Sequence, residues 1–222
     1  MNLGQAIIEW DRVVDQQDEI VTRLGEHLQL TLIAVAIGLL ISFPLGVFAY
    51  RHRWSYGPVT AVTGILYTIP SIALFAALIP FTGLSKTTAT IGLVSYTLLI
   101  LIRNVVAGLD GVPDDTREAA VGMGYTRRQL FWKVEMPLAL PVIMAGVRLA
   151  TVTTIGLVTV AALIGEGGLG YFILYGFRTF DSTISFIGGS LSMILAVVAD
   201  FALVQIERRT TPWASKQVSA VG

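Results

Sequence analysis

The chain has 222 residues, a formal net charge of zero at pH 7, 54% hydrophobic side chains and only 14% charged ones. About a quarter of the residues in an average soluble domain are charged, and the apolar residues here form long blocks. This composition excludes a disordered chain, and the lack of cysteine excludes a disulfide-stapled secreted fold. The balanced charge argues against nucleic-acid binding, which requires a basic face. The sequence therefore predicts an integral membrane protein.

Residues 1–27 are predicted to form an extracytoplasmic segment before the first span. They are acidic and interrupted by charges, without the basic start and apolar core of a signal peptide. Five apolar residues could share one face of a short helix: Ile7, Ile8, Trp10, Val13 and Val14. We favour a helix that lies on the membrane surface over disorder.

Five later stretches are long and apolar enough to cross a membrane. A spanning helix needs roughly 20 mainly apolar residues to cross about 30 Å of hydrocarbon. The stretches that meet this condition are 28–50, 58–80, 88–109, 137–164 and 184–206. None alternates like a membrane β-strand over its full length. The predicted fold is all-α, with about five transmembrane helices in a domain over 28–209 and a cytoplasmic tail over 210–222.

The placement of lysine and arginine predicts the orientation, because these residues are enriched in cytoplasmic loops. If the connection 111–136 is cytoplasmic, nine basic residues lie on that side: Arg51, Arg53, Arg117, Arg127, Arg128, Lys133, Arg208, Arg209 and Lys216. Four lie on the other side: Arg12, Arg23, Lys86 and Arg178. The N-terminus is therefore predicted outside and the C-terminus inside.

The connection 111–136 is predicted to contain two short helices. Asp115 and Glu118 have capping-box spacing, and Gly122 with Gly124 should end this first helix. Thr126 and Gln129 form a second capping box. A plain connection between two spans would be shorter. We interpret this unit as a docking element that ends at Pro137, where the fourth span begins.

The same connection carries a spaced signature that resembles the EAA-x3-G-x9-I-x-L-P motif of ABC-importer permeases. Valine and methionine replace the usual isoleucine and leucine of that motif. The matching residues are Glu118, Ala119, Ala120, Gly124, Val134, Met136 and Pro137. The resemblance implies that the two helices seat in a groove of a cytoplasmic ABC ATPase subunit and transmit its closure.

Other segments resemble the osmoprotectant branch of these permeases, which transports glycine betaine, carnitine or choline. The similar segments are Thr68-Ile69-Pro70-Ser71, Arg103-Asn104, 137–148 and the glycine-rich segment 165–170. The resemblance covers about residues 28–213. Methionine permeases share a related glycine segment, so methionine or another amino acid is the alternative substrate.

The resemblance implies a type I importer in a bacterial plasma (inner) membrane. Its permease pairs with a second copy or a paralogue, and an extracytoplasmic binding protein delivers the substrate. The chain has no G-x-x-x-x-G-K-[ST] phosphate loop. It is therefore expected to be a non-catalytic subunit without a cofactor, with ATP and Mg²⁺ on the partner ATPase.

Eight residues are expected to line or gate the translocation path: Thr68, Pro70, Ser71, Arg148, Glu166, Gly167, Gly168 and Gly170. The glycine-rich segment also fits the dinucleotide fingerprint G-x-G-x-x-G, but it follows a membrane span and lacks a βαβ context. We interpret it as a closely packed loop at the outer end of the fourth span. Glu166 is expected to contact the binding protein or to attract a cationic solute.

Charged residues inside the spans are expensive and should be paired or face water. Arg103 and Asp200 both lie about 9 Å from the inner end of their spans, at 1.5 Å per residue. We therefore predict an ion pair between them, with snorkelling of Arg103 to lipid headgroups as the alternative. A second functional alternative, an ion-coupled secondary transporter, would need intramembrane carboxylates, and Asp200 alone lies clearly within a span.

Overall fold

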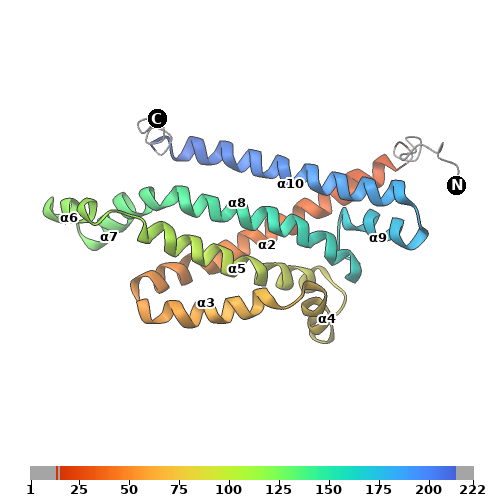
Figure 1. Ribbon diagram of the computed structural model, residues 1–222, viewed down its shortest axis with the longest axis horizontal. Coiled ribbons are helices and arrows are strands. Elements are labelled where there is room, and N and C mark those ends of the chain that lie inside the picture. Colours follow the sequence, from red (N-terminus) through yellow and green to blue (C-terminus); the bar gives the residue numbers. More distant parts are fainter. Residues whose placement is uncertain (1–13, 15, 214–222) are drawn as a thin grey trace. The chain divides into compact units, whose positions relative to one another are not determined.

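The computed structural model describes residue 14 and residues 16–213, and these residues contain helices without strands. The predicted surface helix over 7–14 and most of the tail over 210–222 lie outside this part. The helices, labelled in Figure 1, are α2 (Gln17–Arg51), α3 (Arg53–Thr68), α4 (Ser71–Thr82), α5 (Lys86–Asp110), α6 (Asp114–Gly122), α7 (Arg127–Leu130), the π-helical η1 (Phe131–Glu135), α8 (Met136–Ala161), the 3₁₀ turn η2 (Ala162–Ile164), α9 (Gly170–Thr179) and α10 (Ser182–Thr210).

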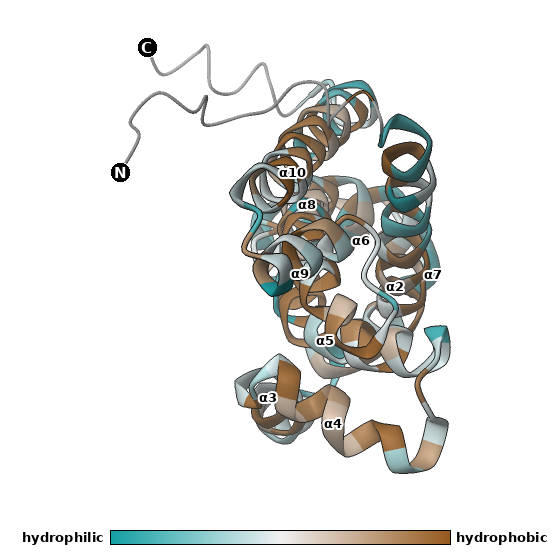
Figure 2. Ribbon diagram, turned by 90° about the vertical axis from the view of Figure 1, so that its right-hand side faces the viewer, coloured by the Kyte–Doolittle hydropathy of each residue, from teal (hydrophilic) through white to brown (hydrophobic). Residues whose placement is uncertain are grey.

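Four of the helical segments are long and apolar enough to cross a membrane by themselves: Gln17–Arg51, Lys86–Asp110, Arg127–Ile164 and Ser182–Thr210. They contain the first, third, fourth and fifth predicted spans. Figure 2 shows the brown of hydrophobic residues recurring along these helices. The all-α membrane architecture predicted from the sequence is therefore confirmed.

The helix that contains the first predicted span begins before that span, at Gln17. Arg23 forms ion pairs with Glu19 at 2.8 Å and with Glu26 at 2.9 Å, at helical i, i+4 and i, i+3 spacings. Such pairs stabilise a helix even where its residues are charged. Residues 17–27 are therefore a helical extension of the first predicted span.

The second predicted span is broken instead of continuous. Helices α3 and α4 are bent by 95° relative to each other, and together they form one candidate span, which brings the possible number to five. The break falls at Ile69 and Pro70, where Pro70 has φ −56° and ψ 134°. A residue before proline is disfavoured in the α conformation, and proline cannot donate a helical hydrogen bond. The stretch 58–80 predicted from the sequence is therefore divided into two helices at Pro70.

The chain divides into two compact units, and α2, α5, α8 and α10 contribute residues to both. Unit 1 comprises Met1–Ala36, Ile69–Val94 and Thr151–Val198. Unit 2 comprises Ile37–Thr68, Ser95–Ala150 and Ala199–Gly222. The site residues below are therefore described within their own unit.

The core of unit 1 forms around α9, which the sequence analysis did not predict because its ten residues are too few to span a membrane. Leu169, Phe172 and Ile184 are buried together. Partly buried residues of α2 and α10 pack against them: Ile20, Leu24, Leu191 and Leu195. Helix α9 therefore anchors the start of α2 and the start of α10 to one apolar cluster.

His27 is fully buried in unit 1, although its position near the start of the predicted span suggested an interfacial side chain. Its Nε2 lies 3.0 Å from the Ile155 carbonyl oxygen, and its Nδ1 accepts the Leu169 backbone N–H at 3.3 Å. Because a carbonyl oxygen only accepts, the imidazole must donate through Nε2 and accept through Nδ1. One side chain of α2 thus joins α8 to the start of α9.

The core of unit 2 lies where α2, α5, η1 and α8 meet. Its buried members are Val105, Leu109, Phe131, Ala139 and Ile143. Helices approach closely at glycines: a Cβ at Gly46 would lie 2.7 Å from the Val105 side chain, and one at Gly108 would lie 2.8 Å from the Ala139 carbonyl oxygen. Small residues at such contacts are typical of membrane helix packing, which depends on close backbone approach.

The buried hydrogen bonds of His27 lead to a first prediction. His27→Ala should lower the free energy of unfolding by roughly 2–4 kcal/mol, since it leaves two backbone groups unpaired and opens a cavity. The apparent Tm in detergent should then fall by roughly 5–10 °C. Thr31→Val is the matched control, because within the described part of the chain the buried Thr31 hydroxyl has no hydrogen-bond partner. An equal loss of Tm in both variants would contradict the role assigned to His27.

Candidate functional site

The first helix of the 111–136 connection, α6, begins at Asp114, but without the capping box predicted for it. Its N-cap position is Pro113, which makes no side-chain capping hydrogen bond, so the Asp115–Glu118 capping box was wrong. Asp114 and Asp115 instead occupy the first turn, where negative charges interact favourably with the helix dipole. The proline and the acidic turn together start the helix without a capping side chain.

The turn after α6 requires Gly124. This residue has φ +81°, a left-handed conformation that glycine adopts without steric cost. The backbone N–H of Gly124 donates to the Val121 carbonyl oxygen at 2.9 Å, and that of Tyr125 donates to the Ala120 carbonyl oxygen at 3.1 Å. The predicted helix-ending role of Gly124 is confirmed, and the turn places α7 directly after α6.

The second helix, α7, begins with the predicted capping box. The Thr126 hydroxyl accepts the Gln129 backbone N–H at 3.3 Å, while the Gln129 side chain accepts the Thr126 backbone N–H at 2.9 Å. However, the helix does not stop at Pro137. It continues through the π-helical η1, whose last hydrogen bond runs from the Met136 N–H to the Phe131 carbonyl oxygen, directly into α8. The fourth span thus begins within one residue of the predicted Pro137, but it follows the loop helix without an intervening turn.

The signature residues separate into an exposed set and a packed set. Glu118, Ala119 and Gly124 are exposed, whereas Ala120 is 1% exposed. Val134, Met136 and Pro137 are half-buried at the start of the fourth span. Beside Glu118, two large apolar side chains are open to solvent: Val121 at 58% and Met123 at 69%. Exposed apolar side chains around a carboxylate are typical of a surface that another protein covers.

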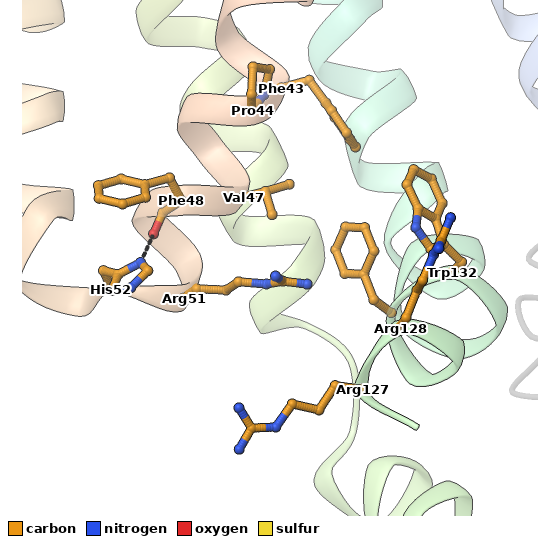
Figure 3. A pocket seen from close by; sticks show the side chains of 10 residues that line it. Phe43, Pro44, Val47, Phe48, Arg51, His52, Arg127, Arg128 and Trp132 are labelled. Carbon is orange, nitrogen blue, oxygen red and sulfur yellow. Dashed lines mark hydrogen bonds between the residues drawn. The ribbon is translucent and has the colours of Figure 1, made fainter. Parts of the chain in front are cut away.

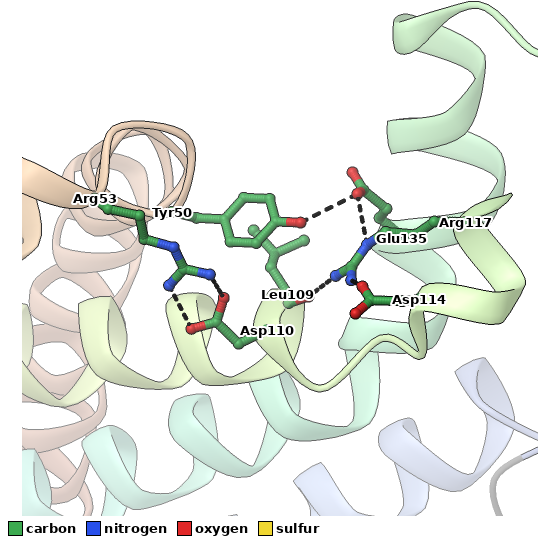
Figure 4. Close-up of polar contacts among 7 residues, drawn as sticks. All are labelled: Tyr50, Arg53, Leu109, Asp110, Asp114, Arg117 and Glu135. Carbon is green, nitrogen blue, oxygen red and sulfur yellow. Dashed lines mark hydrogen bonds and ion pairs between the residues drawn. The ribbon is translucent and has the colours of Figure 1, made fainter. Parts of the chain in front are cut away.

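Arg117, next to Glu118, connects this loop to the membrane helices of unit 2 (Figure 4). Its Nη1 donates to Asp114 at 2.6 Å, its Nη2 to the Leu109 carbonyl oxygen at 2.7 Å, and its Nε to Glu135 at 3.2 Å. The Tyr50 hydroxyl donates to the same Glu135 oxygen at 3.1 Å. The cluster thus links the ends of α2 and α5 to α6 and η1.

The charges of this cluster stabilise one another. Burial alone would lower the pKa of Arg117, but the hydrogen bonds to Asp114 and Glu135 and the neighbouring Tyr50 outweigh it, so its pKa is raised. Arg117 therefore stays charged at any physiological pH. The sequence analysis missed this cluster, although the charge of Glu135 at the apolar start of the fourth span was a signal that it needs a partner.

A second ion pair lies at the same end of unit 2. Arg53 of α3 donates to both carboxylate oxygens of Asp110 at the end of α5, at 2.8 and 2.5 Å (Figure 4). The bidentate geometry is the strongest that a guanidinium and a carboxylate can form. It fixes the start of α3 to the end of α5.

The glycine-rich loop of unit 1 is closely packed. A Cβ at Gly167 would lie 2.1 Å from the Ala162 nitrogen, and one at Gly168, where φ is +46°, would lie 2.7 Å from His27. A Cβ at Gly170 would lie 2.2 Å from a carbonyl oxygen of α8. Real Cβ atoms do not approach other atoms so closely, so side chains are excluded at all three positions. Glu166 between them is half-buried.

The segment Thr68-Ile69-Pro70-Ser71 forms the break between α3 and α4. Thr68 and Pro70 are exposed and Ser71 is half-buried. The Thr68 hydroxyl donates to the carbonyl oxygen of Ile65 within its own helix at 2.8 Å. Thr68 and Arg148 belong to unit 2, whereas Ser71 and the glycine-rich loop belong to unit 1.

The predicted partner of Asp200 was wrong. Arg148, and not Arg103, forms the ion pair: its Nε donates to Asp200 at 2.9 Å and its Nη2 to the other carboxylate oxygen at 3.2 Å. Its Nη1 donates to Glu207 at 3.2 Å. Arg103 is exposed and has no ion pair within residues 16–213. Depth along the span favoured Arg103, but the long Arg148 side chain reaches Asp200 from its deeper position.

The Arg148 pair leads to a double-mutant prediction. Arg148→Met and Asp200→Asn should show a coupling free energy of roughly 0.5–3 kcal/mol in unfolding of the purified protein, because residues that share hydrogen bonds are not additive. Arg103→Met with Asp200→Asn is the matched control and should be additive within about 0.5 kcal/mol. Coupling in the Arg103 cycle and additivity in the Arg148 cycle would contradict the Arg148–Asp200 pair and favour the Arg103–Asp200 pair predicted from the sequence.

Comparison with known proteins identifies the family. The model of the family described as "Binding-protein-dependent transport system inner membrane component" matches residues 31–212. The glycine betaine/carnitine/choline transport system permease protein OpuCB of Bacillus subtilis is 39% identical over 195 residues, which are 87% of this chain and 89% of that protein. The osmoprotectant import permease protein OsmW of Salmonella typhimurium is 40% identical over 192 residues, or 84% of this chain and 89% of that protein.

Solved structures agree with this assignment. The inward-facing MetNI methionine ABC transporter contains a chain that matches with a TM-score of 0.80 at 27% identity, over 89% of this chain and 98% of that one. Family and fold together exclude the secondary-transporter alternative. The chain belongs to the family of binding-protein-dependent transport system inner membrane components, and it is a non-catalytic permease subunit of an ABC importer.

Proposed function

We propose that this permease imports quaternary-ammonium compatible solutes such as glycine betaine, carnitine or choline across a bacterial inner membrane. The observation that carries the proposal is its 39–40% identity, over most of both chains, to permeases named for these solutes or for osmoprotectants. The segments 68–71, 103–104, 137–148 and 165–170, which resemble this branch, support it.

A methionine permease is the second candidate. The support for it is the similarity to the MetNI structure, which extends over nearly the whole of that chain at 27% identity. The osmoprotectant permeases are more similar in sequence, at 39% identity over a comparable length. We therefore rank methionine or another amino acid below the quaternary-ammonium solutes.

The ATPase docking surface in this proposal is the exposed side of α6. Glu118 and Ala119 lie there beside the exposed Val121 and Met123, and the small Ala119 permits close approach. Movement of α6 would reach the membrane helices through the Arg117 cluster and through the uninterrupted run from α7 into α8. ATP and Mg²⁺ would be held by the partner ATPase.

The side of the membrane opposite to the ATPase would face the binding protein. In this orientation the N-terminus is outside and the C-terminus is cytoplasmic, as the distribution of basic residues favours. Eight basic residues in the described part of the chain lie at the predicted cytoplasmic ends of the spans or between them: Arg51, Arg53, Arg117, Arg127, Arg128, Lys133, Arg208 and Arg209. The glycine-rich loop with Glu166 follows the predicted outer end of the fourth span and would receive the substrate.

A second permease subunit would complete the translocation path. Two Bacillus subtilis relatives, OpuCB and OpuCD, carry the name of the same glycine betaine/carnitine/choline transport system. A paralogue is thus a plausible partner beside a second copy of this chain. Thr68, Pro70, Ser71, Arg148 and the loop over 166–170 remain our candidates for lining or gating the path, with Arg148 held by Asp200 and Glu207.

The docking surface can be tested by a charge reversal at Glu118 and by a side chain at Gly124. Glu118→Lys and Gly124→Val should leave the protein in the membrane but reduce uptake about tenfold or more, which corresponds to about 1.4 kcal/mol of lost coupling. Co-purification of the ATPase and the ratio of hydrolysis to uptake measure this loss. Asp18→Lys, an equal charge change on the exposed start of α2, is the control. Normal coupling in both α6-loop variants would contradict the docking surface.

The substrate class can be tested with the assembled importer in proteoliposomes. Its binding protein, loaded in turn with glycine betaine, carnitine, choline or methionine, should stimulate ATP hydrolysis and uptake only with the quaternary-ammonium solutes. Specificity of an importer of this type follows the solute that its binding protein delivers. Stimulation by methionine alone would replace the proposed substrate class with the second candidate.

A further inference from the structure

A groove of about 640 Å³ lies in unit 2, between the last turns of α2 and the helical run of α7 and η1 (Figure 3). Neither the family nor the coupling mechanism assigns it a role. Its lining residues are Phe43, Pro44, Val47, Phe48, Arg51, His52, Arg127, Arg128, Phe131 and Trp132. The lining contains three guanidiniums and no carboxylate.

The three arginines of the groove are free to bind an anion. Arg51, Arg127 and Arg128 are exposed, and within residues 16–213 none of them forms an ion pair with a carboxylate. At the same end of unit 2, Arg53 and Arg117 are both neutralised by aspartate or glutamate. The Arg51 guanidinium lies 5.0 Å from the Phe131 ring centroid, a cation–π contact that orients it without neutralising it.

The apolar wall of the groove continues into the spanning part of α2. Phe43 precedes Arg51 by eight residues, which corresponds to about 12 Å along the helix. The groove therefore leads from side chains at hydrocarbon depth to guanidiniums where the span ends. Trp132 and His52 line its polar end, and aromatic residues of this kind are typical of the membrane interface.

We propose that this groove binds an anionic phospholipid. The phosphate lies among Arg51, Arg127 and Arg128, which offer planar donors suited to phosphate oxygens. An acyl chain lies against Phe43 and Val47. A free phosphate ion would use the arginines but not the apolar wall, and a zwitterionic lipid would bring its own cation into a site that already has three positive charges. The proposal is independent of which solute is imported.

The test uses the fluorescence of Trp132 in the assembled transporter. Trp10, Trp54 and Trp213 are replaced by phenylalanine, and the complex is placed in bilayers that contain brominated phosphatidylglycerol or brominated phosphatidylcholine. Trp132 should be quenched by the anionic lipid at a mole fraction at least about tenfold lower than by the zwitterionic lipid, given three unpaired arginines. Unlabelled phosphatidylglycerol should reverse the quenching, and inorganic phosphate should not.

Two groove variants and one control decide the result. Arg51→Gln/Arg128→Gln should abolish the preference for phosphatidylglycerol, and so should Arg127→Gln/Arg128→Gln, which changes only exposed side chains and preserves the fold. Arg208→Gln/Arg209→Gln, at the end of α10 and outside the groove, should retain the preference. Equal quenching by both lipids, reversal by inorganic phosphate, an unchanged preference in both groove variants, or an equal loss in the control would each overturn the proposal.

Discussion

The connection between the 111–136 loop and the membrane helices of unit 2 depends on the guanidinium of Arg117. Arg117 binds a carboxylate of its own helix, the Leu109 carbonyl group near the end of α5 and the buried Glu135 of η1, and Glu135 also accepts the Tyr50 hydroxyl of α2. Breaking a buried pair by removing one partner costs more than the pair contributes, because the remaining charge is left without compensation. The loop that carries the exposed Glu118 is therefore fastened to the membrane helices by a contact that resists partial opening. An ATPase that pulls on α6 would displace α5 and η1 together with it.

The continuity of α7, η1 and α8 adds a second rigid connection. A proline at the start of a span would be expected to break the helix, but the π-helical turn before it shifts the hydrogen-bond pattern. Residue 137 thus lies in a helical run that is unbroken from α7 to α8. The one turn between α6 and α7 depends on Gly124, whose left-handed backbone is accessible without strain only to glycine.

Composition and spacing predicted the membrane class, the spans other than the second and the capping box at Thr126. They could not predict features that depend on how helices rotate about their axes. The depth of Arg103 matched that of Asp200, yet Arg148 makes the pair, because Asp200 and Glu207 are two turns apart on α10 and one guanidinium reaches both. The burial of His27 against α8 and the start of α9 is another such feature. Helix α9 was missed because an amphipathic helix of ten residues has no span-length signal.

Six arginines of unit 2 form two groups with different surroundings. Arg53, Arg117 and Arg148 each bind a carboxylate from another helix or from η1, so their charges hold helices together. Arg51, Arg127 and Arg128 surround an apolar groove without such partners. An exposed charge without a partner gains no ion-pair energy, and three like charges at one groove repel one another. In the empty groove the repulsion among the three charges costs free energy, and an anion that lies among them relieves this repulsion. The proposed lipid site therefore uses arginines that do not stabilise the fold.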